Sequence, residues 1–133
     1  MSEQAENSLR TRIDELMKAG VSANLQALQS IYHKDLQIMM LDNTGHLMTM
    51  DKPTCLNMLE QTFKNENPDD HMWSNIHAVS ASGDTGHVLI SRKIPMGGPK
   101  MMVDLSIDFV FEDGRWQVIR EVNFARPVDD LAA

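Results

Sequence analysis

The chain has 133 residues, of which 42% are hydrophobic and 23% are charged. This length is enough for one domain with a hydrophobic core and too short for two. The formal net charge of −7 argues against a protein that neutralises nucleic-acid phosphates, because such a protein needs a clustered basic surface. We therefore expect a single domain over residues 1–133 that does not bind nucleic acid.

The N-terminal segment and the cysteine content bear on the cellular compartment. Seven of the first twenty residues are charged, so they contain no apolar signal-peptide core, and no run in the chain approaches membrane-spanning length. The single cysteine, Cys55, cannot form an internal disulfide, which agrees with a reducing compartment. We expect a cytoplasmic protein without membrane association.

Three helices are predicted in the first half of the chain. The first runs over residues 5–19 and ends at Gly20, which suits a helix C-terminus. The second begins at a cap on Ser22 or Asn24, and the third begins at Asp51, because these side chains accept free backbone N–H groups. The apolar stripes of the three helices are Leu9, Ile13, Leu16 and Met17; Leu25, Leu28, Ile31 and Tyr32; and Leu56, Leu59 and Phe63. Short helices with one apolar stripe need a common surface to pack on.

Extended segments make up most of the remaining chain. They are predicted at residues 36–41, 46–50, 73–81, 86–94, 101–111 and 116–124. The segment from Ile94 to Met102 is predicted as an apolar loop, and its part from Pro95 to Pro99 is a hypothetical lid. Helices followed by antiparallel hairpins predict an α+β fold in which a curved sheet wraps over the helices.

Asp113 and Gly114 form the strongest turn signal, because a two-residue Asp-Gly loop favours a β-hairpin. Counting outward from this turn pairs Glu112 with Arg115 and alternates the side chains between two faces. One face then contains Val103, Leu105, Ile107, Phe109, Phe111, Trp116, Val118, Arg120, Val122 and Phe124. The other contains Asp104, Ser106, Asp108, Val110, Gln117, Ile119, Glu121 and Asn123. We expect the first face to be covered, with Arg120 as its one polar side chain.

The preceding hairpin has a weaker turn at residues 83–84. Pairing Ser82 with Thr85 gives its covered face a mixed set of side chains. That face contains Trp73, Asn75, His77, Val79, Val88, Ile90, Arg92 and Ile94. A slip of one residue would exchange the two faces of one strand.

Several local strings resemble the nuclear transport factor 2-like (NTF2-like) superfamily, in particular its SnoaL-like and related small bacterial members. Residues 24–28 (Asn-Leu-Gln-Ala-Leu) through 31–35 (Ile-Tyr-His-Lys-Asp) are similar to the family's D-L-x-A-L-x-x-L-[FY]-x-x-D segment. The turn at residues 83–85 and the closing string Asp-Gly-Arg-Trp at 113–116 resemble its two later hairpins. The resemblance covers nearly the whole chain and implies a cone-shaped fold, but this fold hosts many functions.

The resemblance implies a conical pocket between helices and sheet, and a homodimer formed through the sheet. The catalytic positions of a ketosteroid-isomerase-like mechanism fall near Leu16, Met40 and Ile107. None of these carries the required tyrosine or acid, so that proton transfer is not expected. The residues predicted to bind the ligand are Arg120, Arg92, Asn75, Trp73, Met40, Leu16 and Ile107.

Arg92 and Arg120 are the charged groups expected on the covered face. A buried guanidinium needs a carboxylate, carbonyls, water or an anionic ligand, because its desolvation is otherwise costly. Two inward arginines therefore favour a ligand with a carboxylate or a similar acceptor. Alternatively, Arg92 reaches water from a strand end, and Arg120 pairs with an acid such as Glu15 or Asp14.

His77 is the predicted catalytic acid or base, because imidazole titrates near neutral pH and Asn75 or a carboxylate can orient it. The alternative is a hydrogen-bonded structural histidine. Trp73 either forms the floor of the pocket or fills it, and Cys55 is interpreted as a packing residue. The other histidines lack metal-ligand spacing, so neither a metal nor another cofactor is expected.

Two functions follow from these patterns. The first is binding of a small, largely apolar ligand with an acidic or carbonyl group in the conical pocket, either without catalysis or with isomerase, dehydratase or cyclase activity. In that case His77 carries the proton and Arg120 anchors the ligand. The second is a non-catalytic homodimeric binding or assembly module. Its working surface would be the outer sheet face with Asp104, Asp108, Ile119, Glu121 and Asn123.

Overall fold

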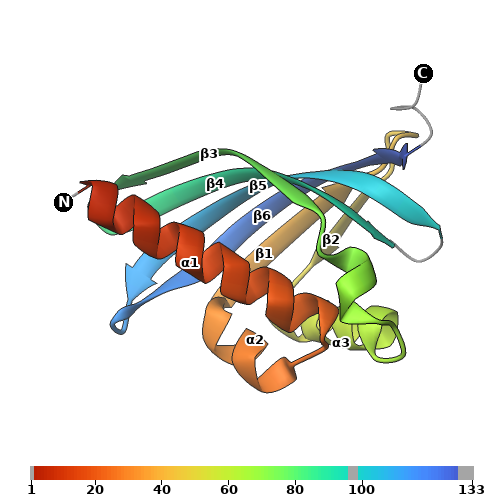
Figure 1. Ribbon diagram of the computed structural model, residues 1–133, viewed down its shortest axis with the longest axis horizontal. Helices are drawn as coiled ribbons and strands as arrows, with labels where there is room; N and C mark the ends of the chain where they lie inside the picture. The colour runs from red at the N-terminus through yellow and green to blue at the C-terminus, as the bar shows by residue number, and fades with distance from the viewer. Residues whose placement is uncertain (1, 96–98, 129–133) are drawn as a thin grey trace.

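A computed structural model describes residues 2–95 and 99–128. A long first helix crosses one face of a curved sheet, and two shorter helices lie beside it (Figure 1). The helices are α1 (Ser2–Val21), α2 (Leu25–Ile31) and α3 (Lys52–Phe63), with a short 3₁₀ turn, η1 (Pro68–His71). No helix within the described ranges is long and apolar enough to cross a membrane.

Six strands form a single sheet in the order β2-β1-β6-β5-β4-β3. Their bounds are β1 (Tyr32–Leu41), β2 (Leu47–Met50), β3 (Ser74–Ser82), β4 (Thr85–Pro95), β5 (Lys100–Glu112) and β6 (Arg115–Pro127). The pairing of β1 with β6 is parallel, and the other four pairings are antiparallel. The α+β prediction of helices on a curved, mostly antiparallel sheet is therefore confirmed.

The helix starts follow the predicted capping. The Asn24 side chain accepts a hydrogen bond from the Ala27 N–H at 3.2 Å, and the Asp51 side chain accepts one from the Thr54 N–H at 3.1 Å. Both caps satisfy backbone donors that a helix leaves free in its first turn. Asn24, rather than Ser22, is thus the cap of α2.

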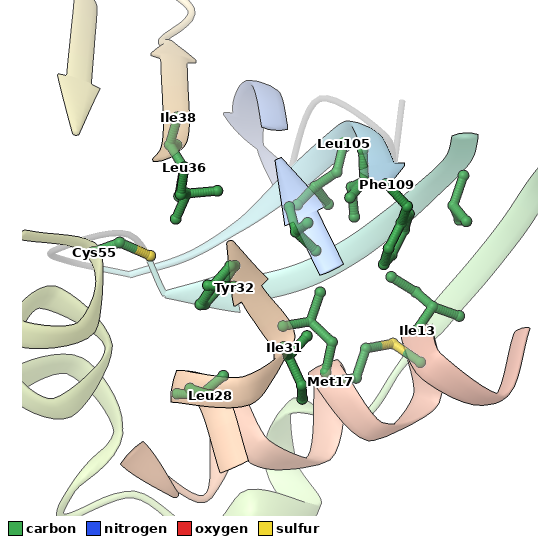
Figure 2. Close-up of a cluster of buried hydrophobic side chains, with 14 of the residues drawn as sticks. Ile13, Met17, Leu28, Ile31, Tyr32, Leu36, Ile38, Cys55, Leu105 and Phe109 are labelled. Carbon is green, nitrogen blue, oxygen red and sulfur yellow. The ribbon is translucent and has the colours of Figure 1, made fainter. Parts of the chain in front are cut away.

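The core lies between the helices and the inner face of the sheet. Leu9 and Ile13 of α1, Ile31 of α2, and Val103 and Phe109 of β5 are each at most 1% exposed. Figure 2 shows Ile13 and Met17 projecting from α1 toward the sheet, on the side where Phe109 lies. Gly86 of β4 permits this close packing, because a Cβ atom there would lie 2.6 Å from Leu9 Cδ1.

The central hairpin has the predicted turn and the predicted register near it. Asp113 (φ 55°) and Gly114 (φ 77°) both have positive φ, as a type I′ turn requires. Glu112 pairs with Arg115, and Phe109 pairs with Val118. The expected burial of Phe111 is wrong, because Phe111 is 42% exposed.

The loop predicted from Ile94 to Met102 is shorter than expected. β4 continues to Pro95 and β5 begins at Lys100, which pairs with Pro95. Pairing satisfies backbone groups that a loop would leave to water, so the strands extend into a segment whose composition suggested a loop. Residues 96–98 of the hypothetical lid lie outside the described ranges.

Phe109→Ala is expected to lower the free energy of unfolding by about 3–5 kcal/mol, because it leaves a cavity in the core. Phe111→Ala is the matched control, and it should cost about 1 kcal/mol or less, mainly through its edge-on contact with Trp116. Urea denaturation of both variants measures the difference. Equal losses would contradict the inner-face register.

Candidate functional site

A cavity of about 70 Å³ lies between the helices and the inner face of the sheet. Its wall is mostly apolar and includes three methionines, Met17, Met50 and Met58. A volume of this size holds about two water molecules, whereas pockets for drug-sized ligands measure about 300–1,000 Å³. A larger ligand therefore requires side chains to move, and methionine is the most adaptable apolar side chain for this purpose.

Five polar side chains from four elements face this cavity. They are Tyr32 at the start of β1, Cys55 in the first turn of α3, Arg92 of β4, and Glu121 and Asn123 of β6. None is more than 9% exposed. A mostly apolar cavity with a few convergent polar groups is the usual form of a small-molecule site.

Among the residues that the structure describes, Arg92 is the only basic side chain lining the cavity, and the prediction that it faces inward is confirmed. Its Nη2 donates a hydrogen bond to the His71 carbonyl oxygen at 2.7 Å. Its buried Nε has no hydrogen-bond partner among the described residues. Burial lowers the pKa of the Arg92 guanidinium, and Glu121 and Tyr32 oppose that shift. The group stays charged at neutral pH because arginine is effectively always protonated in proteins.

Glu121 and Asn123 form a buried pair on β6. Asn123 Nδ2 donates a hydrogen bond to Glu121 Oε2 at 3.1 Å, while buried Asn123 Oδ1 has no partner among the described residues. Burial raises the pKa of the Glu121 carboxyl, and the hydrogen bond from Asn123 and the charge of Arg92 oppose this shift. Glu121 is therefore a carboxyl poised to bind a proton more readily than one in water.

Tyr32 and Cys55 remain protonated at neutral pH. Burial raises the pKa of the Tyr32 hydroxyl well above its ordinary value and raises the pKa of the Cys55 thiol to about 12. In Figure 2 the Cys55 sulfur extends from α3 toward the part of the core where Tyr32 lies. Because the thiolate is the nucleophilic form, Cys55 is not an activated nucleophile.

A β-bulge at Ile119 determines which β6 residues face the cavity. Phe109 pairs with Val118, but Asp108 pairs with Arg120, so β6 has one extra residue at this point. The predicted inward orientation of Arg120 is therefore wrong. Its side chain is 53% exposed, and Nε lies 3.5 Å from the Asp108 carboxylate on the outer face. The extra residue also turns Glu121 and Asn123 inward, so their predicted place on the outer face is wrong.

A second irregularity, at His77, changes the predicted face of β3. Ile76 pairs with Ile90 and Ala78 pairs with Leu89, so His77 is the extra residue. The predicted inward orientations of His77 and Asn75 are therefore wrong, because Ile76 takes the inner position next to Ile90. The same register places Asn75 opposite Ser91, whose neighbours Ile90 and Arg92 face inward.

Trp73 also lies outside the cavity, contrary to the prediction. It precedes β3, its side chain is 45% exposed, and the Lys93 ammonium lies 4.6 Å from the centre of its ring. A cation over an aromatic face is a favourable contact at the surface. Trp73 therefore neither floors nor fills the cavity.

His77 takes part in a polar chain on the outer face. Its Nε2 lies 2.8 Å from Ser91 Oγ, and Ser91 Oγ donates to Asp104 Oδ1 at 2.6 Å. Arg126 Nη2 lies 3.2 Å from the same carboxylate. In a catalytic triad the histidine stands between serine and acid. Here the serine stands between histidine and acid, so this arrangement does not activate Ser91.

The remaining predicted ligand-binding positions differ in their placement. Leu16 and Ile107 line the cavity. Met40 lies on the same inner face but lines a neighbouring groove. The sequence carried one signal for the missed pair Glu121 and Asn123, namely two adjacent apolar residues, Val118 and Ile119, which interrupt the alternation of β6.

Comparison with known proteins identifies the fold. No protein-family model and no curated protein sequence matches the chain. An NTF2-like protein of unknown function from Silicibacter pomeroyi is 18% identical, with a TM-score of 0.79 over 93% of this chain and 98% of that chain. An NTF2-like protein of unknown function from Shewanella baltica is 13% identical, with a TM-score of 0.74 over 93% and 95%.

A structural neighbour of a different kind is the CaMKII hub of S. rosetta. It is 15% identical, with a TM-score of 0.65 over 91% of this chain and 96% of that chain. At such identities the similarity concerns the fold, because one fold hosts unrelated functions. The chain has the NTF2-like fold, as the sequence resemblance implied.

Glu121→Gln is expected to change the pH dependence of stability. Because burial raises the folded-state pKa of Glu121, the stability linked to this carboxyl is fully present below its unfolded value of about 4.5 and is lost as the pH rises through the folded-state pKa. The Gln variant cannot ionise, so its free energy of unfolding should fall less as the pH rises above about 4.5. Urea denaturation at a series of pH values measures this.

The matched control is Glu60→Gln, which removes a carboxylate that does not line the cavity. This variant should keep the pH profile of the wild type. A Glu121→Gln profile parallel to that of the wild type would show that Glu121 is not buried as a titrating group.

Proposed function

We propose that the protein binds a small, largely apolar ligand whose acidic or carbonyl group contacts Arg92 in the cavity. The observation that carries this proposal is the buried guanidinium of Arg92, which has a free Nε–H and no direct ion pair with Glu121 across the cavity. A buried charge without a counterion in direct contact lowers the stability of the folded state. A ligand oxygen that accepts from Nε would offset that cost and gain a charge-assisted hydrogen bond.

A second buried atom without a hydrogen-bond partner among the described residues, Asn123 Oδ1, further restricts the functional groups that the ligand can carry. It accepts hydrogen bonds, so it complements a donor on the ligand, whereas Arg92 complements an acceptor. A carboxylic acid, a hydroxy-carbonyl group or a carboxamide presents both. The rest of the ligand must be apolar, because most of the cavity wall is aliphatic or thioether.

Glu121 supports acid–base chemistry at the same site. A carboxyl with a raised pKa exchanges protons more effectively near neutral pH than an ordinary one. Isomerase, dehydratase and cyclase reactions each require a proton to move to or from a group near a carbonyl. We assign the proton-carrying role to Glu121 in place of His77, because Glu121 faces the cavity and His77 bonds to Ser91 on the other face.

Arg92→Gln is expected to weaken binding of butyrate by at least about tenfold, because it removes the charged anchor. The neutral comparison 1-butanol should bind weakly to both proteins. Chemical-shift titration by NMR gives the affinities and reports whether the fold is retained. Lys93→Gln is the matched control, since it removes the adjacent cation on the opposite face of β4 and should leave butyrate binding unchanged.

Equal butyrate affinity in wild type and Arg92→Gln, with the spectrum otherwise intact, would contradict this proposal. A loss of the same size in Lys93→Gln would show that the carboxylate binds by general charge attraction rather than in the cavity.

A second candidate function is assembly through the outer face of the sheet. Leu41 pairs with Leu47 of β2 and with Phe124 of β6, which places three large apolar side chains side by side. Leu47 is 54% exposed and Phe124 is 48% exposed. Contiguous exposed apolar side chains are typical of interaction sites. The similarity to a hub domain is consistent with this function, in which a homodimer would form through this patch.

Phe124→Asp is expected to shift a homodimer toward monomer, because it places a charge in the apolar patch beside Leu41. Sedimentation velocity over a range of protein concentrations measures the effect. Asp108→Asn, which changes the outer face away from the patch, is the control and should leave the assembly state unchanged. A wild-type protein that remains monomeric at high concentration would rule out homodimeric assembly.

A further inference from the structure

A second hollow continues the inner face of the sheet beyond the cavity. We call it the methionine groove. It is lined by Met40 and Leu41 of β1, Asp42, Asn43 and His46 of the turn after β1, Met48 of β2, Pro99, Met101 of β5, and Asn123 and Ala125 of β6. Its volume is about 360 Å³, several times that of the cavity. Figure 1 shows these strands running past the helices at the end of the sheet opposite the start of α1.

The sheet register brings the methionines of this groove together. Met40 lies opposite Met48 on one side and opposite Asn123 on the other. Directly opposed residues have their Cβ atoms about 5 Å apart, so the two thioether side chains share one surface. Met48 is 50% exposed. Met40 beside it is half-buried. A partly exposed pair of flexible apolar side chains is a surface that adapts to an apolar partner.

Asn123 joins the groove to the cavity, because it lines both. The two hollows differ in chemistry, although the groove also has polar lining residues, Asp42, Asn43 and His46, in the turn between β1 and β2. The cavity is small and holds the charged groups Arg92 and Glu121, whereas the lining of the groove next to Asn123 is methionine and alanine. A molecule that extends from the cavity over the methionines must therefore be polar at the end inside the cavity and apolar along the part that contacts Met40, Met48 and Met101.

We propose that the ligand is an elongated amphiphile, a medium-chain carboxylic acid or acyl carbonyl compound, bound with its head inward. The head group occupies the cavity against Arg92 and Asn123, and the hydrocarbon tail lies over Met40 and Met48. This inference rests on the proposed function of the cavity and extends it to the substrate class. The cavity alone has room for little more than a head group, so the groove supplies the remaining contact area.

The affinity of saturated carboxylates should rise with chain length. Each methylene removed from water into the groove should strengthen binding by about fourfold. Butyrate, hexanoate and octanoate, titrated by NMR, test this dependence. Butyrate, which is little more than a head group, tests mainly the cavity, and the longer acids test the groove.

Two variants separate the groove from the cavity. Met48→Gln keeps the length of the side chain but removes its apolar end, and it should weaken octanoate by at least about fivefold while leaving butyrate unchanged. Met39→Gln is the matched control, because Met39 pairs with Val122 on the opposite face of the sheet. It should leave the affinity for both acids unchanged.

Orientation is tested with protein carrying ¹³C-labelled methionine methyl groups. The terminal methyl of octanoate should give nuclear Overhauser contacts to Met40 and Met48, and none to Met17 inside the cavity. Contacts to Met17 would overturn head-inward binding. Octanol that binds as tightly as octanoate, and is insensitive to Arg92→Gln, would overturn it as well.

The failure of this inference differs from the failure of the proposed function. If butyrate binding depends on Arg92 but octanoate binds no more tightly than butyrate, binding of the tail in the groove is contradicted. The proposed function of the cavity is then retained. Carboxylate binding that is unaffected by Arg92→Gln at every chain length would contradict both proposals, the cavity site and the groove.

Discussion

One inserted residue in β6, Ile119, determines which polar side chains of this strand line the cavity. If the strands β5 and β6 alternated without interruption from their turn, the interior would receive Arg120 and the surface would receive Glu121. The bulge at Ile119 reverses this and places Glu121 and Asn123 on the inner face, opposite Ile107 and Leu105. The cavity thereby gains an acid and an amide in addition to the arginine of β4.

The cavity then contains a basic group, Arg92, and an acidic group, Glu121, that form no direct ion pair. Arg92 is tied to the His71 carbonyl oxygen, and Glu121 is tied to the Asn123 amide. Each anchor fixes a side chain while leaving part of its hydrogen-bonding capacity unused. Such an arrangement costs stability relative to an apolar filling. Under the proposed function, a ligand completes these hydrogen bonds and offsets that cost.

The sequence predicted features that depend on a few neighbouring residues, such as helix caps and turns. It failed for strand faces, which depend on counting residues along a whole strand. The caps at Asn24 and Asp51 and the turn at Asp113 were readable because each depends on a few neighbouring atoms. Strand faces depend on counting from a turn, so one bulge reverses every assignment beyond it. Arg92 was placed correctly because no bulge interrupts β4, whereas Arg120 and His77 were misplaced because a bulge lies at or beside each. In β3 the inward residues Ile76 and Val79 are three positions apart instead of two, which is the trace that a bulge leaves in a sequence.

The orientation of residues after the Ile119 bulge is the central claim, and thiol accessibility tests it most directly. In a Cys55→Ala background, the variants Arg120→Cys and Glu121→Cys place a thiol on adjacent positions of β6. The structure predicts that Arg120→Cys reacts with a water-soluble thiol reagent as an exposed group does, and that Glu121→Cys reacts roughly tenfold or more slowly, because its reaction requires local opening. A faster reaction at position 121 than at position 120 would contradict the inward placement of Glu121 and the site built on it.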